Sequence, residues 1–350
     1  MQYSREAIQE LIEQAGLSRV RDGLERLMKP SIRLTLRPAD EANIPVGASK
    51  FGGLPDLSPG AEWPRCADLP PEEGFGYVEK QCLGGPLWFL GQVNLADAAP
   101  LDTENALPRS GLLSFFAAIQ RDGFPCDGVT PDCWRVLYHN GDLSALRRTP
   151  VPPVPDALRE ALAQGSPLPG GYTSTPCAVE FSLSYTLPSH PDVGMTEEEA
   201  DRYWEAFWNV FHGEDEARRH LILGYEGPLQ GSTGEMAGAC EATDIEEDEF
   251  TALLQDGDDS AEWWQKHKEA VKAQNEREAQ LGPEGLWAEQ EEKEQAERAQ
   301  RARWRLLLQL DTEPEAGLFW PAWGRGYFCI THDALAARDF DRACLVNQHT

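Results

Sequence analysis

The spacing of apolar residues predicts one helical segment followed by a strand. Residues 4–29 carry apolar side chains at helical spacing, with an interruption near Gly16. Pro30 ends this segment, because the residue before a proline avoids the helical conformation. Residues 32–36 alternate between apolar and polar side chains, which is typical of a strand. The next segment, 38–86, is rich in proline and glycine and is expected to be mostly loop.

Most of the remaining chain has the pattern of short strands, with one well-marked helix among them. Thr196 and Glu199 form a capping box with Thr196 as the N-cap, and they predict a helix that runs to about His212. Strands are expected at 87–95, 111–119, 134–138, 177–185, 220–225, 304–310, 317–320, 326–330 and 343–347. Such a mixture of helices and hairpin-connected strands indicates an α+β protein.

The segment 241–303 differs from the rest in composition. It holds 19 Asp and Glu against 8 Lys and Arg. We expect three helices in it, at 246–254, 260–281 and 283–303. A helix that is charged on most sides exposes those sides to water, so the segment predicts a protruding acidic insertion.

Two stretches of the chain resemble each other and predict an internal repeat. The first, 89–94, ends in Gln92-Val93-Asn94 and precedes the expected strand at 111–119. The second, 306–311, ends in Gln309-Leu310-Asp311 and precedes the expected strand at 317–320. The repeat predicts antiparallel sheets built from two related, duplicated halves. The expected domain layout is an N-terminal helix at 1–30, an α+β domain at 31–240 and 304–350, and the helical insertion at 241–303, before the last hairpin.

Several of these stretches also carry a resemblance to a known family. They are 49–55 (SKFGGLP), 62–64 (EWP), 89–95 (FLGQVNL), 107–113 (LPRSGLL), 220–225 (HLILGY), 326–328 (GYF) and 339–341 (DFD). Together they resemble the YwqG-like family, domain of unknown function 1963. The family has no established enzymatic activity, so the resemblance supplies none that can be carried over to this chain. It does imply an immunity role, because some members of the family are encoded near secreted toxins.

The first candidate binding residues surround the unrepeated segment 50–64. Lys50 is one of only seven lysines in the chain, and it precedes Gly52-Gly53. The two glycines either cradle a phosphate or supply a turn that needs positive φ, and no Gly-x-x-x-x-Gly-Lys-Ser/Thr motif supports the phosphate. If the two halves enclose a cleft, the residues expected to line it are Lys50, Trp63, Gln92 and His220.

The second group of candidates is the three tryptophans of the insertion, Trp263, Trp264 and Trp287. Tryptophan is enriched in binding hot spots, so these side chains either anchor a protein partner or dock the insertion onto the body. No catalytic motif is present. Cys126, Cys133 and His139 are spaced too widely for a typical structural zinc site. We therefore expect no catalytic residue, no metal and no cofactor.

The overall charge narrows the class of partner. The chain has 59 acidic and 31 basic residues, for a net charge of −28. A field of this sign repels nucleic acid and anionic membranes and attracts basic proteins. No apolar run approaches the roughly 20 residues of a membrane span. The N-terminus lacks the apolar core of a signal peptide, and the eight cysteines contain no Cys-x-x-Cys pair, so a cytoplasmic location is expected.

These observations favour a non-enzymatic, acidic protein-binding module. The particular hypothesis is an immunity-type protein that binds and neutralises a basic bacterial toxin domain. Two alternatives stay open from the sequence alone. One is a small-ligand-binding or enzymatic domain that uses the cleft between the halves. The other is a structural adaptor.

Overall fold

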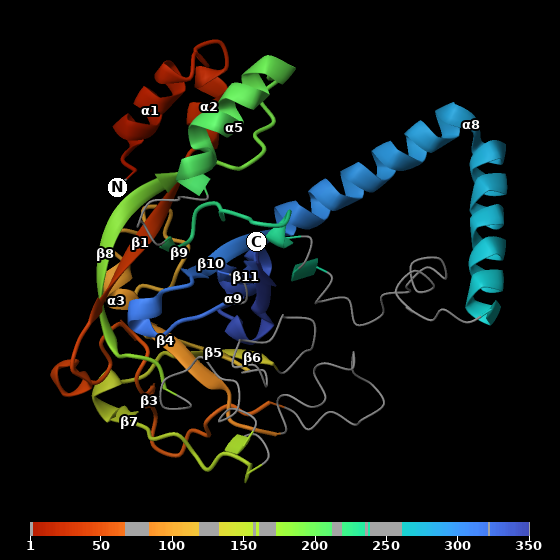
Figure 1. Ribbon diagram of the computed structural model, residues 1–350. Helices are drawn as coiled ribbons and strands as arrows, with labels where there is room; N and C mark the ends of the chain where they lie inside the picture. Colours follow the sequence, from red (N-terminus) through yellow and green to blue (C-terminus); the bar gives the residue numbers. More distant parts are fainter. Residues whose placement is uncertain are drawn as a thin grey trace.

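A long antiparallel pair of strands runs through the middle of the protein. In the computed structural model, β1 (Lys29–Pro38) pairs over its whole length with β8 (Cys177–Thr186). The structure describes residues 3–66, 84–118, 133–156, 159–160, 173–211, 219–234, 237–238, 261–320 and 323–349. Figure 1 shows the β1–β8 pair rising from the sheet toward a group of helices at one end of the molecule.

The other strands extend the sheet on both sides of this pair. They are β2 (Lys50–Phe51), β3 (Asp56–Leu57), β4 (Trp88–Asn94), β5 (Leu112–Ala117), β6 (Trp134–His139), β7 (Arg147–Arg148), β9 (His220–Ile222), β10 (Trp304–Asp311), β11 (Arg325–Thr331) and β12 (Cys344–Gln348). Within the described residues, ten strands form one antiparallel sheet in the order β12-β11-β10-β9-β1-β8-β2-β4-β5-β6. β3 and β7 form a separate two-stranded sheet.

The large sheet curves into a nearly closed barrel. Its two ends meet where the indole Nε1 of Trp134, on β6, donates a 2.7 Å hydrogen bond to the carbonyl oxygen of Ala343, next to β12. Inside, the rings of Phe115 on β5 and Phe328 on β11 pack edge to face with centroids 5.0 Å apart. The apolar side chains of both ends of the sheet therefore share one core.

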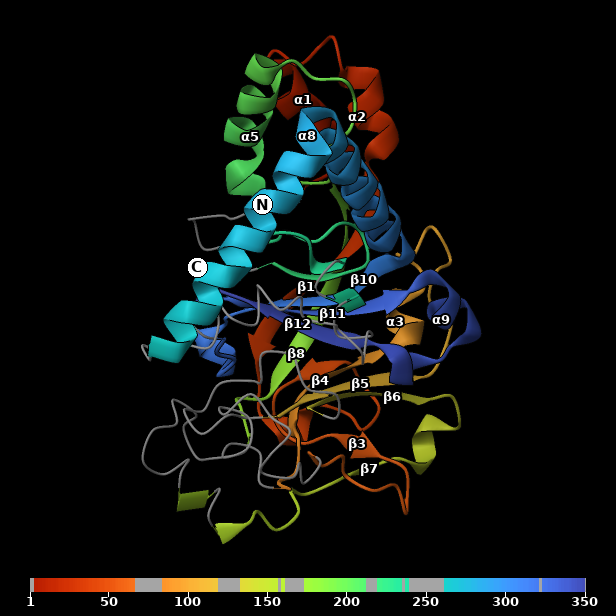
Figure 2. The same ribbon diagram turned by 90° about the vertical axis from the view of Figure 1, so that its right-hand side faces the viewer.

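The helices lie at the ends and edges of this sheet. Among the described residues they include α1 (Arg5–Gln14), α2 (Arg21–Leu27), α3 (Leu95–Ala98), α5 (Glu197–Phe211), α8 (Ala261–Arg303) and α9 (His332–Ala337), with the 3₁₀ turns η1 (Glu41–Asn43), η2 (Leu143–Ala145), η3 (Pro314–Ala316) and η5 (Phe340–Arg342). Figure 2 shows α1, α2 and α5 gathered at the far end of the β1–β8 pair. None of the helices in the described ranges has the length and apolar character that crossing a membrane requires.

The three helices at this end have an apolar core of their own. Tyr203 and Phe207 of α5 stack with centroids 4.7 Å apart and pack with Ile8 and Ile12 of α1. The helix expected over 4–29 is two helices, because Gly16 between them has φ of 67°. The expected break is confirmed.

The capping box at the start of α5 is also confirmed. The backbone N–H of Glu199 donates to the Thr196 hydroxyl at 3.2 Å, and the Thr196 N–H donates to the Glu199 carboxylate at 2.9 Å. This carboxylate also accepts hydrogen bonds from Arg19 of the segment between α1 and α2. The cap therefore ties α5 to the N-terminal helices.

The C-terminal strands correct two expectations. Residues 317–320 do not form a strand, because Gly317 adopts φ of 66° as the C-cap of η3 and Leu318 makes only an isolated bridge to Glu313. The strand that pairs with β10 is β11. The insertion therefore precedes a run of three strands, β10, β11 and β12, instead of a final hairpin, and the strands of both halves form one main sheet instead of several.

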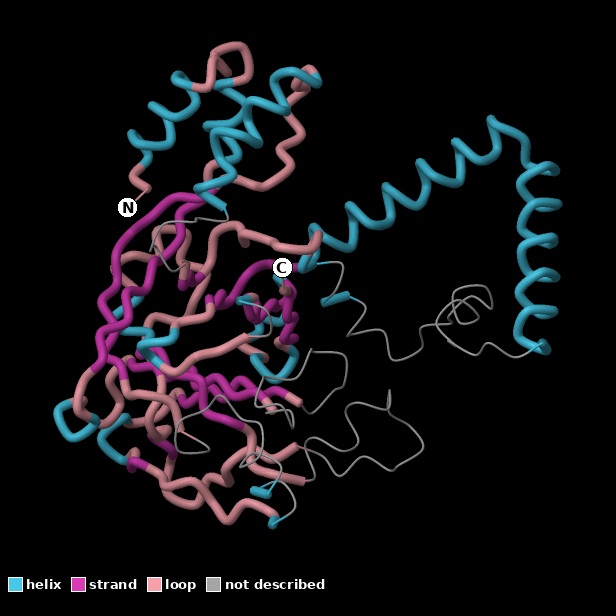
Figure 3. Tube along the Cα trace, in the orientation of Figure 1, coloured by secondary structure: helices cyan, strands magenta, loops and turns pink. Residues whose placement is uncertain are grey.

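The helix α8 forms a long arm that leaves the body of the protein. It breaks at Gly282, whose φ of 65° and ψ of 176° are not helical, and Pro283 begins its second part. The two parts match the helices expected at 260–281 and 283–303. Figures 1 and 3 show the second part leading away from the sheet to the break, and the first part standing apart from the body at a sharp angle to the second. The helix expected at 246–254 lies outside the described residues.

Candidate functional site

The amide of Gln92 joins strand β4 to the segment 48–56, which contains β2. Its side chain is fully buried. The Gln92 Nε2 donates to the carbonyl oxygen of Ala48 at 2.8 Å and to the carboxylate of Asp56 at 2.7 Å. Its Oε1 accepts the backbone N–H of Asp56 at 3.0 Å. Buried polar groups need such partners, so this one amide fixes both ends of the segment 48–56.

Lys50 lies inside that segment and is closed to solvent. Its Nζ donates to Glu41 at 2.9 Å and to the carbonyl oxygen of Leu54, and lies 4.0 Å from Asp56. Burial lowers the pKa of Lys50, although the hydrogen bond to Glu41 and the charge of Asp56 oppose this shift. The ammonium group therefore has two carboxylates and a carbonyl around it, which suits a structural ion cluster.

Arg148, at the end of β7, completes this cluster. Its Nε donates to Asp56 at 2.8 Å, and one terminal nitrogen donates to the backbone carbonyl of Glu41 at 3.0 Å. Burial acts to raise the pKa of Asp56, but the bonds from Arg148 and Gly47 and the charge of Lys50 outweigh it and lower this pKa. Asp56 is thus an ionised carboxylate held between two cations.

The two glycines after Lys50 provide the turn geometry of this segment. Gly52 and Gly53 have φ of 69° and 67°. A Cβ on Gly52 would lie 2.1 Å from the carbonyl oxygen of Thr175, and one on Gly53 would lie 2.4 Å from the Glu41 carboxylate. Only glycine fits both the positive φ and these close approaches. The turn alternative accounts for both residues.

A second glutamine occupies the corresponding place in the second half of the sheet, which contains β9 to β12; the first half contains β2 and β4 to β6. The Nε2 of Gln309 on β10 donates to the carbonyl oxygen of Arg219 at 2.9 Å, and its Oε1 accepts the N–H of Gly227 at 3.0 Å. Arg219 and Gly227 are as far apart in sequence as Ala48 and Asp56. Both glutamines thus hold a loop of the same length by its two ends.

The correspondence between the halves extends to the residue that follows each carbonyl bound by a glutamine, Ala48 in the first half and Arg219 in the second. The Ser49 hydroxyl accepts the backbone N–H of Asn94 at 2.9 Å, while the His220 Nδ1 accepts that of Asp311 at 3.3 Å. His220 is buried, and its other ring nitrogen lies 3.6 Å from Glu313. The position predicted as a candidate binding histidine therefore has the same backbone contact as a serine in the first half.

The second half encloses a different set of charges. The Arg325 guanidinium donates to the Asp311 carboxylate and, at 2.8 Å, to the carbonyl oxygen of Gly227. The hydroxyl of Tyr327 donates to the same carbonyl at 2.8 Å, and burial raises the pKa of this tyrosine. An arginine–aspartate pair here stands where the first half has the Lys50 cluster.

Of the four residues predicted to line a cleft, the structure brings two together. Lys50 and Gln92 are opposite each other on β2 and β4. His220 lies on β9, with β1 and β8 between it and β2. Trp63 packs edge to face on Phe116 in the core, and its Nε1 donates to the Leu87 carbonyl at 2.7 Å.

Sequence reasoning missed Glu41, Asp56 and Arg148. All three lie in segments that were expected to be loop or had no assigned role. Asp56 and Arg148 are opposite each other on β3 and β7, two strands of only two residues each. The one available signal was the pair of adjacent arginines, Arg147 and Arg148, in a strongly acidic chain.

The tryptophans of the insertion lie on α8. Trp287 is 75% exposed, just beyond the break at Gly282, so it does not dock the arm onto the body. The side chains of Trp263 and Trp264 lie outside the described part. Residues 261–303 carry 10 acidic and 8 basic side chains, so most of the insertion's net negative charge belongs to 241–260, also outside the described residues.

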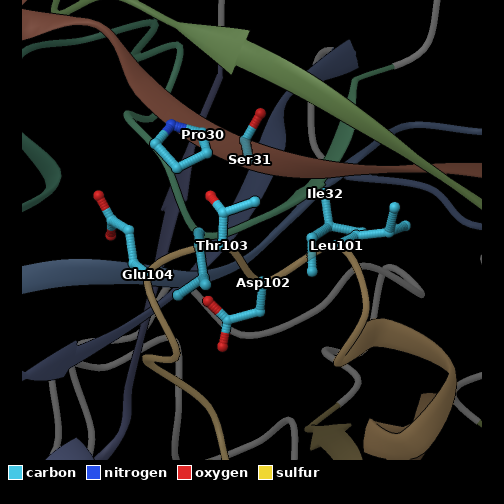
Figure 4. Close-up of a pocket in the computed structure, with 8 residues that line it drawn as sticks. Pro30, Ser31, Ile32, Leu101, Asp102, Thr103 and Glu104 are labelled. Atoms are coloured by element: carbon cyan, nitrogen blue, oxygen red, sulfur yellow. The ribbon is translucent and has the colours of Figure 1, made fainter.

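A small hollow lies between β1 and the segment after α3. Figure 4 shows it lined by residues 30–32 and 101–104, with Leu223 beside them. The space in it, about 170 Å³, includes open solvent, and none of it encloses a water molecule. Pockets for small organic ligands usually enclose about 300–1,000 Å³. This hollow is too small for such a ligand.

A nearly closed antiparallel sheet with a glutamine clamp in each half defines a mixed α+β domain with buried ion clusters. The chain belongs to the family described as domain of unknown function DUF1963, whose model matches residues 49–348. This confirms the resemblance seen in the sequence. The match begins after β1, the strand that joins the two halves of the sheet. No curated protein matches the chain.

Proposed function

We propose that this protein is a non-enzymatic, acidic protein-binding module of the immunity type, which binds and neutralises a basic toxin domain. The observation that carries the proposal is the α8 arm. It leaves the body of the protein and exposes Trp287, one of the residues most enriched in binding hot spots, to 75%. An exposed tryptophan on a solvated helix gains apolar contacts only when a partner covers it.

The charge of the chain supports a basic partner. With a net charge of −28, the protein attracts a cationic surface over distances of about a Debye length, roughly 8 Å at physiological salt. The same charge repels a second copy of the chain and repels nucleic acid. Steering of this kind mainly raises the association rate and weakens with added salt.

The polar clusters support a binding role over an enzymatic one. Within each half, the charged groups bond to each other. Lys50 donates to Glu41 in the first half, and Arg325 donates to Asp311 in the second. Catalytic groups normally converge on a pocket that admits a substrate. The alternative of a small-ligand or enzymatic cleft has less support, because His220 lies apart from Lys50 in the sheet.

The test is co-expression of the full chain with a basic toxin domain encoded beside its gene, in a bacterial host. Protection of the cells is expected. Trp287→Ala should weaken the affinity for the purified toxin by at least about 30-fold, which corresponds to the usual threshold of about 2 kcal/mol for a hot-spot residue. Trp323→Ala is the matched control, because Trp323 is also 66% exposed but lies on the body. An equal loss of affinity with both variants would contradict the proposal. So would a failure of the unaltered chain to protect the cells.

We further propose that the sheet consists of two copies of one five-strand unit, β1-β2-β4-β5-β6 and β8-β9-β10-β11-β12, whose first strands are exchanged. In this arrangement β1 pairs with β9 and β8 pairs with β2. Both units also have a register shift at the same distance before the glutamine, at Phe89/Gly91 and at Leu306/Leu308. The paired glutamine contacts support the same correspondence.

A further inference from the structure

Two cysteine thiols lie next to each other in the core of the first half. The sulfur atoms of Cys66 and Cys133 are 3.7 Å apart. Both residues are present as thiols, with exposed fractions of 4% and 0%. A disulfide has a sulfur–sulfur distance of about 2.05 Å, so closing the gap needs a movement of roughly 1.7 Å.

We propose that Cys66 and Cys133 form an oxidation site, at which hydrogen peroxide converts the two thiols into a disulfide. This proposal does not depend on the binding function proposed above. It rests on the distance between the two sulfur atoms and on the backbone that holds them. The Cys66 N–H donates to the carbonyl of Gly85, and the Cys133 carbonyl accepts the N–H of Ala118 at 2.6 Å.

The chemistry balances with one molecule of peroxide. The thiolate of Cys66, the more exposed of the two, attacks the O–O bond, forms a sulfur–oxygen bond and releases hydroxide. The Cys133 sulfur then attacks the Cys66 sulfenic acid, which forms the sulfur–sulfur bond and releases water. The two thiols lose two electrons and two protons, and the peroxide is reduced to two waters.

The bond would close a long loop in the chain. Cys66 and Cys133 are 67 positions apart in sequence. Such a link restricts the unfolded chain, and long loops gain the most from closure. It would tie the segment before β4 to the start of β6, so that the oxidised protein unfolds at a higher temperature than the reduced one.

Three other cysteines of the described residues provide internal comparisons. Cys329 and Cys344 are opposite each other on β11 and β12, so they are the competing pair. The Cys177 sulfur donates to the carbonyl of Thr175 at 3.5 Å instead of facing another sulfur. Burial raises the pKa of the Cys177 thiol to about 12, which makes it a poor nucleophile.

The experiment treats the purified full chain with hydrogen peroxide, blocks the remaining thiols with N-ethylmaleimide in denaturant, and maps the peptides by mass spectrometry. A peptide pair joined through Cys66 and Cys133 is expected, together with a rise in melting temperature of at least about 3 °C. Reduction with dithiothreitol should reverse both changes.

Variants make the assignment specific. Cys66→Ala and Cys133→Ala should each abolish the joined peptide and the rise in melting temperature, while Cys177→Ala should keep both. Mapping on the unaltered chain needs no variant to fold. A product joined through Cys329 and Cys344, a bond of Cys66 to any other cysteine, or sulfinic acid without a joined peptide would overturn the proposal.

Discussion

The two halves of the sheet share a backbone arrangement but enclose different charges. In both, a buried glutamine holds the ends of one loop, through Asp56 in the first half and Gly227 in the second. The first half adds an ion cluster around Lys50, whereas the second has the Arg325–Asp311 pair. The comparison teaches that the glutamine contacts accompany the strand arrangement in both halves, while the charges around them differ.

Removal of Asp56 is expected to have the largest effect on this comparison. In Asp56→Ala, Lys50 and Arg148 each lose a carboxylate partner in a largely buried place. Breaking a buried ion pair from one side costs about 3–5 kcal/mol of the free energy of unfolding. Urea unfolding followed by tryptophan fluorescence measures this loss.

The control for this variant is Asp341→Ala, in an exposed turn, which should change the free energy of unfolding by less than about 0.5 kcal/mol. A loss below about 1 kcal/mol for Asp56→Ala would show that the cluster around Lys50 adds little to stability. The first half would then depend on its glutamine clamp alone.

A second pair of variants tests whether the two glutamine clamps are equivalent. Gln92→Leu and Gln309→Leu each leave a buried carbonyl and a buried N–H without their partner, which costs about 2–4 kcal/mol. The Gln92 change should cost about 1 kcal/mol more, because its amide also donates to the Asp56 carboxylate. Urea unfolding of both single variants and the double variant measures these losses.

The two glutamines lie in different halves, so the losses in the free energy of unfolding from the two single variants should add to within about 0.5 kcal/mol in the double variant. A near-neutral Gln309→Leu would break the comparison. It would mean that the Arg325–Asp311 pair holds the loop at 219–227 in place without help from Gln309.

The local pattern of the sequence was enough to predict most of the fold. Nine of the expected strands and the capping box at Thr196 appear in the structure, because alternation and capping act over a few residues. The strand expected at 317–320 is wrong, since Gly317 ends η3 in the left-handed conformation and the chain continues as loop. The very short strands β2 and β3 had no pattern long enough to reveal them.

The site was harder to predict, because its residues meet only through the tertiary structure. Lys50 and Gln92 were found from the sequence, one as a rare lysine and one through the repeat. Glu41, which accepts a hydrogen bond from Lys50, and Arg148, which donates one to Asp56, lie in unrelated segments. A single sequence gives no sign that these segments meet. The exposure of Trp287 was likewise undecided until the direction of the α8 arm was known.

The smallest expected effect is on the stability of the protein at acid pH. The lowered pKa of Asp56 means that the folded state keeps this carboxylate ionised more readily than the unfolded chain, whose ordinary value is 3.8. The stability that it contributes is therefore present above this ordinary value and is lost as the pH falls through the lowered folded value. Lys50 affects stability instead between its lowered folded pKa and its ordinary value of 10.5.

Asp56→Asn isolates this contribution. It keeps the shape of the side chain but cannot ionise, so its free energy of unfolding should fall less steeply between pH 5 and pH 3 than that of the unaltered chain. The capping carboxylate Glu199, with a pKa of about 2 set by its hydrogen bond to Arg19, titrates in both proteins and cancels in the difference. Parallel pH profiles for the two proteins would show that the acid sensitivity comes from carboxylates other than Asp56, and the charges of the first half would then contribute no more pH dependence than those of the second.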